Sequence, residues 1–104
     1  MPEFVRLASI DEIPADGMRA FEHDGRRIAL YRIGDEIYAT DDICSHEYAH
    51  LSEGWLEPED YTVECPLHGS RFDIRTGAAL TLAAFAPIAV YPVRIEGQDV
   101  LVEL

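Results

Sequence analysis

The chain has 104 residues, of which 48% are hydrophobic, and its mean hydropathy of −0.06 is typical of a globular domain. This length allows one hydrophobic core but not two, so we expect a single domain over residues 1–104. Twenty acidic residues oppose eight arginines, with no lysine, and the net charge of −12 argues against nucleic acid or an anionic membrane surface as a partner.

No apolar segment approaches the roughly 18 residues that a membrane-spanning helix needs. The first residues, Met1-Pro2-Glu3-Phe4, lack the basic and apolar parts of a signal peptide. We therefore expect a cytoplasmic location, where thiols stay reduced. A disulfide between Cys44 and Cys65 is accordingly disfavoured, and it would leave the histidines beside them unexplained.

The rest of the pattern predicts short strands separated by turns. The dipeptide Asp24-Gly25 is typical of a tight hairpin. Helical turns are expected over 11–15 and after His46, and the Ala-rich segment 78–89 is expected to be a loop because it contains Pro87. Strands at this spacing indicate an all-β sandwich or small barrel. The expected strands cover residues 4–7, 18–23, 26–32, 37–40, 61–64, 71–74, 89–95 and 100–104.

Both cysteines stand just ahead of a histidine, in Cys44-Ser45-His46 and in Cys65-Pro66-Leu67-His68. Two thiolates and two imidazoles on two loops predict a four-ligand metal or cluster site. A zinc ion accepts this set, but zinc fingers place both cysteines on one loop and both histidines on a helix. The alternative is a [2Fe–2S] cluster in which two histidines replace two cysteines. His50 is a rival ligand, disfavoured because it breaks the symmetry of the two pairs.

These motifs, with Gly69-Ser70, Phe72-Asp73, Thr76-Gly77, Pro87 and Tyr91-Pro92-Val93, make the chain resemble the Rieske family. It is most similar to the small ferredoxins of bacterial aromatic-ring dioxygenase systems. The resemblance implies an antiparallel β-sandwich base with a small cluster-binding subdomain built from two loops, about residues 42–52 and 64–72. It also implies one [2Fe–2S] cluster, with Cys44 and Cys65 on one iron and His46 and His68 on the other.

The resemblance further implies a one-electron carrier between a flavin-dependent ferredoxin reductase and a terminal ring-hydroxylating oxygenase. We expect no enzyme activity, because 104 residues leave no room for the mononuclear iron domain of an oxygenase. Two alternatives stay open: a small subunit of another oxidoreductase such as nitrite reductase, and a structural zinc module that binds other proteins.

Around the expected cluster, four residues have predicted supporting roles. With two neutral imidazoles the oxidised cluster carries no net charge, so it accepts an electron more readily than a four-cysteine cluster and its potential falls between about −150 and +300 mV. Ser70 occupies a serine position that donates a hydrogen bond in high-potential relatives, whereas Phe72 replaces a tyrosine, which favours the lower part of this range. Leu67 stands where those relatives have an extra cysteine and is expected to shield the cluster, as is the loop that contains Pro87.

Overall fold

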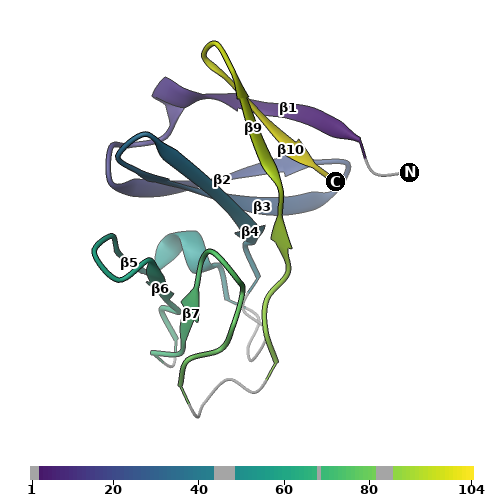
Figure 1. Cartoon of the computed structure of the whole chain (residues 1–104). Coiled ribbons are helices and arrows are strands. Elements are labelled where there is room, and N and C mark those ends of the chain that lie inside the picture. The colour runs from purple at the N-terminus through teal and green to yellow at the C-terminus, as the bar shows by residue number, and fades with distance from the viewer. Residues whose placement is uncertain (1–2, 44–48, 68, 82–85) are drawn as a thin grey trace.

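The computed structural model describes residues 3–43, 49–67, 69–81 and 86–104, and their ordered elements are strands and two short 3₁₀ turns (Figure 1). No helix in these ranges is long and apolar enough to cross a membrane. The elements in chain order are β1 (Phe4–Ser9), η1 (Ile10–Glu12), β2 (Gly17–His23), β3 (Arg26–Ile33), β4 (Glu36–Asp41), η2 (Leu51–Glu53), β5 (Trp55–Glu57), β6 (Thr62–Glu64), β7 (Arg71–Asp73), β8 (Val90–Tyr91), β9 (Val93–Glu96) and β10 (Asp99–Glu103).

The strands form three antiparallel sheets, in the orders β1-β10-β9, β2-β3-β4-β8 and β5-β6-β7. The first two sheets lie over each other and make the base of the molecule, and the third lies beyond them at one end (Figure 1). The expected all-β Rieske architecture, a sandwich base with a small added subdomain, is confirmed.

Strand β3 is buried on both faces, and it separates two hydrophobic cores. Ile28 and Leu30 point into the core between the two base sheets. Ala29 and Tyr31, whose side chains alternate with these, point into the second core, which lies against the small sheet. Cys65 belongs to this second core and is fully buried. The site is therefore built on the core of the protein and not on an independent surface loop.

The hairpin turns follow the predicted chemistry. Asp24 and Gly25 join β2 to β3 with φ angles of 50° and 78°, the left-handed pair that a two-residue turn of type I′ requires. His23 pairs directly with Arg26 across this turn, so the register of the two strands follows from it.

Three elements differ from the sequence-based expectation. The strand predicted over 89–95 is divided at Pro92: β8 pairs with β4, and β9 pairs with β10 in another sheet. Proline has no N–H to donate to a ladder, so the chain changes sheet there. Strand β5 was not predicted, because three residues are too few to show an alternating pattern. The first helical turn covers Ile10–Glu12 instead of 11–15.

Gly54, just before β5, tests how closely the small sheet is packed. A Cβ at this position would lie 1.9 Å from the Glu64 carbonyl oxygen and 3.1 Å from Pro66 Cδ. We expect Gly54→Ala to lower the free energy of unfolding by about 3 kcal/mol or more, because a backbone atom cannot move aside as a side chain can. The measurement is urea unfolding followed by circular dichroism.

The matched control is Gly25→Ala. A Cβ there meets nothing within 4 Å, so its cost is confined to the left-handed backbone, about 1–2 kcal/mol. Equal losses for the two variants would contradict the close approach at Gly54.

Candidate metal centre

The described residues that flank the first cysteine–histidine motif are joined to each other. Ile43 and His50 form an antiparallel bridge, and the Leu51 N–H donates to the Asp42 carbonyl with an N···O distance of 2.6 Å. The Ser52 N–H then donates to Asp42 Oδ1 at 2.7 Å. The residues on the two sides of the gap in the described chain, 42–43 and 50–52, thus contact one another directly.

Asp42 is the polar centre of this closure. Its side chain is fully buried, and one carboxylate oxygen lies 2.5 Å from Arg27 Nε on β3. This hydrogen bond is the main reason why the pKa of Arg27 is raised above its usual value. The ion pair is only partly buried, because the Arg27 side chain is 32% exposed, but loss of Arg27 would leave the buried Asp42 carboxylate without its cation.

The second motif begins at the end of β6, and its loop also closes on itself. The Cys65 N–H donates to the Ser70 carbonyl at 2.7 Å, and the Gly69 N–H donates back to the Cys65 carbonyl at 3.2 Å. Gly69 has a φ of 67°, which allows this sharp reversal. The next pair outward, Glu64 and Arg71, is held by an ion pair of 3.2 Å across the sheet.

The two loops lie side by side. Gly54, which follows the first loop, contacts the backbone of Glu64 immediately before Cys65. Ala49 and Leu51 pack in the same core cluster as Cys65. A hollow of about 320 Å³ opens between the loops, lined by Ala49, His50, Glu53, Pro66 and Leu67.

A third segment, which contains Pro87, approaches the same core. The Gly77 N–H donates to the Asp73 carbonyl at 2.7 Å, and the Ile88 N–H donates to the Gly77 carbonyl at 2.9 Å. Ile88 is buried in the cluster that contains Cys65, while Pro87 itself is exposed. Three segments distant in sequence therefore meet around one cysteine.

Ser70 supplies a test of whether this place fits an iron–sulfur cluster. Its Oγ is buried and has no hydrogen-bond partner among the residues that the structure describes. A buried hydroxyl that stays unpaired costs about 1–3 kcal/mol. A sulfide or thiolate sulfur beside Cys65 is a suitable acceptor, so the described part of the site fits the expected cluster.

The predicted site residues divide into two groups. Cys44, His46 and His68 lie outside the described residues, and within the described ranges no three His, Cys, Asp or Glu side chains gather as a metal site. Of the others, Cys65, Ser70 and Phe72 are buried, whereas Leu67 and Pro87 are exposed. His50 Nδ1 lies 3.5 Å from Glu53 Oε2.

Sequence reasoning missed Asp42 and Gly54. Nothing in the sequence separates Asp42 from the other nineteen acidic residues, because its role depends on Arg27 and Ser52. The sequence held one weak sign for Gly54. It is a glycine near the motifs that is not part of a dipeptide typical of a tight turn, and such a glycine can mark a close approach of two backbone segments.

A family model described as the Rieske [2Fe-2S] domain matches residues 3–92. The ferredoxin component of the naphthalene 1,2-dioxygenase system from Pseudomonas aeruginosa is 41% identical over 102 residues, which cover 98% of this chain and 96% of that protein. The ferredoxin of carbazole 1,9a-dioxygenase from Nocardioides aromaticivorans IC177 superposes with a TM-score of 0.91 at 39% identity, covering 95% of both chains.

A further structure, a complex of reduced oxygenase and oxidised ferredoxin in carbazole 1,9a-dioxygenase, matches with a TM-score of 0.87 at 33% identity, over 96% of this chain and 92% of that one. A nitrite reductase small subunit from Mycobacterium tuberculosis matches at only 19% identity, which shows the fold alone. The matches at higher identity extend over nearly the whole sequence. The chain belongs to the Rieske [2Fe-2S] domain family.

Proposed function

We propose that this chain is a one-electron carrier, a Rieske ferredoxin that takes electrons from a flavin-dependent ferredoxin reductase and passes them to a terminal ring-hydroxylating oxygenase in the breakdown of aromatic compounds. The carrying observation is the buried Ser70 hydroxyl beside the buried Cys65 in a loop closed on itself. The similarity to ferredoxin components of dioxygenase systems over nearly the whole length supports the partners. We place the carrier in the cytoplasm, where its thiols stay reduced.

We further propose the ligand set Cys44 and Cys65 on one iron and His46 and His68 on the other, within a single domain of residues 1–104. When bound, the [2Fe–2S] cluster supplies reversible one-electron transfer. The chain contributes a dry, hydrogen-bonded setting: Cys65 and Phe72 are fully buried, and Ser70 Oγ is available to donate. Exposed Leu67 and Pro87 then shield the site from outside as members of two different loops.

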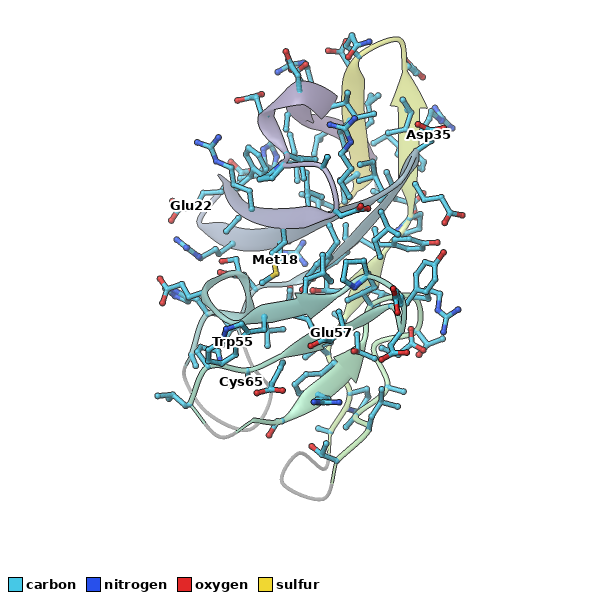
Figure 2. All side chains as sticks on the ribbon, turned by 90° about the vertical axis from the view of Figure 1, so that its left-hand side faces the viewer. Met18, Glu22, Asp35, Trp55, Glu57 and Cys65 are labelled. Atoms are coloured by element: carbon cyan, nitrogen blue, oxygen red, sulfur yellow. The ribbon has the colours of Figure 1, made fainter. Side chains whose placement is uncertain are left out.

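A row of cross-strand neighbours on the surface of the small sheet, next to the loops, is suited to docking. Cross-strand pairing brings Trp55, Glu64 and Arg71 into line, and the Leu80 N–H donates to the Arg71 carbonyl, which places Leu80 at the end of the row. Trp55 and Leu80 are 56% and 52% exposed, although each is large and apolar. Figure 2 shows Trp55 and Cys65 toward the same end of the small sheet. Exposed tryptophans are frequent centres of binding energy.

Charge adds a second property to this surface. Each of the eight arginines already contacts a carboxylate, a hydroxyl, a carbonyl oxygen or an aromatic ring. The net charge of −12 makes the field that a partner meets negative, so partners with basic docking faces are favoured.

The comparisons bear differently on the two alternatives to a ferredoxin, the structural zinc module and the nitrite reductase subunit. Family membership decides against the structural zinc module, because the family is that of a [2Fe–2S] domain. The nitrite reductase subunit has support only at the level of the fold. Rapid mixing decides between carrier and subunit: the purified chain should be reduced by a flavin-dependent ferredoxin reductase and reoxidised by a ring-hydroxylating oxygenase. Failure of both half-reactions with a loaded cluster would overturn the carrier proposal.

His68→Cys tests the ligand set. A thiolate in place of a neutral imidazole adds one negative charge, so the midpoint potential should fall by roughly 100 mV or more, toward the four-cysteine value of about −400 mV. The measurement is a redox titration followed by visible absorbance. The control is His23→Cys on β2, and an unchanged potential in His68→Cys would refute the assignment.

Ser70→Ala tests the hydroxyl. Its hydrogen bond stabilises the more negative, reduced state, so its loss should lower the midpoint potential by tens of millivolts while the cluster stays bound. Ser52→Ala is the control, because Ser52 contributes its backbone N–H to the first loop. Equal potentials in both variants would mean that Ser70 donates elsewhere.

Trp55→Ala tests the docking row. We expect the second-order rate constant for reoxidation by the oxygenase to fall about tenfold, the loss of one binding hot spot. This rate constant should also fall as the salt concentration rises. Ile95→Ala is the control, since Ile95 is an exposed apolar residue on β9, outside the row. The row is excluded as a docking surface if both variants react like the unaltered protein.

A further inference from the structure

The start of β3 and the end of β4 are joined by an ion pair and, beside it, by a chain of two hydrogen bonds. Arg26 and Arg27 follow the β2–β3 turn, and Asp41 and Asp42 stand where the chain leaves β4 toward the first loop. The Asp42 carboxylate meets Arg27, as described above. Asp41 Oδ1 accepts from the Tyr91 hydroxyl at 2.5 Å, and that hydroxyl accepts from an Arg26 guanidinium N–H at 2.6 Å.

The two aspartates bind different segments of the site. Asp42 receives the backbone N–H groups of Leu51 and Ser52, which end the first loop. The Asp41 N–H donates to the Ala89 carbonyl at 3.0 Å, and its side chain holds Tyr91. Asp42 therefore acts on the first loop, and Asp41 acts on the segment that contains Pro87.

Both segments end beside the same cysteine. Leu51 and Ile88 pack in the core cluster of Cys65, and each is within one residue of a backbone group held by an aspartate. A shift of either segment would change the packing around Cys65. Groups that fix metal ligands from behind commonly alter metal affinity by about 10–100-fold when they are replaced.

We propose that Asp41 and Asp42 are positioning residues of the cluster site that act through separate routes, Asp42 with Arg27 on the first loop and Asp41 with Tyr91 and Arg26 on the Pro87 segment. The inference rests on the proposed function, because it concerns the cluster that Cys65 helps to hold. It adds one arginine–aspartate ion pair and one arginine–tyrosine–aspartate hydrogen-bond chain of the base to the residues that decide how the cluster is held.

The test compares Asp42→Asn and Tyr91→Phe with a control. Asp42→Asn keeps an oxygen for Ser52 but loses the charge that Arg27 meets, and Tyr91→Phe loses only the hydroxyl. The control is Asp99→Asn, which removes an arginine contact of 2.8 Å, that of Arg6, in the β1-β10-β9 sheet. The readouts are iron release to a chelator, the electron paramagnetic resonance g-values of the reduced protein, and hydrogen exchange of peptides covering 49–56 and 86–92.

We expect iron release to be about tenfold faster in both variants, with shifted g-values, and to be unchanged in Asp99→Asn. Exchange should rise in peptide 49–56 for Asp42→Asn and in peptide 86–92 for Tyr91→Phe. The double variant should show the product of the two single effects, since separate routes add in free energy. If Asp42→Asn fails to fold, Arg27→Lys replaces it, because lysine keeps the charge but not the Nε geometry.

Two results would overturn the proposal. One is g-values and iron release equal to those of Asp99→Asn, which would leave the contacts a purely structural role. The other is increased exchange in both peptides for each single variant, which would mean one shared route. Failure of the proposed function is distinguishable from both, because it is read in the unaltered protein, which would carry its cluster but would neither be reduced by the reductase nor be reoxidised by the oxygenase.

Discussion

The two-sided burial of β3 is the constraint on which the other parts depend. A strand with apolar side chains on both faces needs a layer on each side, and here one layer is the β1-β10-β9 sheet and the other is the small sheet with its loops. Tyr31 illustrates the second face: its ring is buried, burial raises the pKa of its hydroxyl, and the neutral hydroxyl lies 2.9 Å from Thr40 Oγ1. The cluster-binding end is thus part of the folding unit.

This arrangement ties the described residues on both sides of each cysteine–histidine motif to the core. Each loop is closed at its base by backbone hydrogen bonds, and Gly54 lets the two bases approach to backbone contact. Electron transfer benefits from a site that changes little between oxidation states, and loops tied at both ends and packed on a core meet that requirement.

The charged residues divide into those that pair with each other inside the protein and those that set its net charge. The eight arginines are occupied within the protein, several of them at joints such as Arg27 with Asp42 and Arg71 with Glu64. The remaining carboxylates face outward and set the sign of the surface field. Some carboxylates therefore pair with arginines inside the protein, and the excess of carboxylates over arginines gives the chain its negative charge.

The sequence alone predicted the two cysteine–histidine motifs as a ligand set, and it determined the hairpin at Asp24-Gly25 and the predominance of strands in the described residues, because these depend on neighbouring residues and on composition. Tertiary structure decided which of twenty acidic residues became the buried Asp42, that Pro92 would divide one predicted strand between two sheets, and that Trp55, Glu64, Arg71 and Leu80 would form one row. Each of these outcomes joins residues far apart in the chain. The physical reason is that burial and strand pairing are settled by contacts whose partners no local pattern specifies.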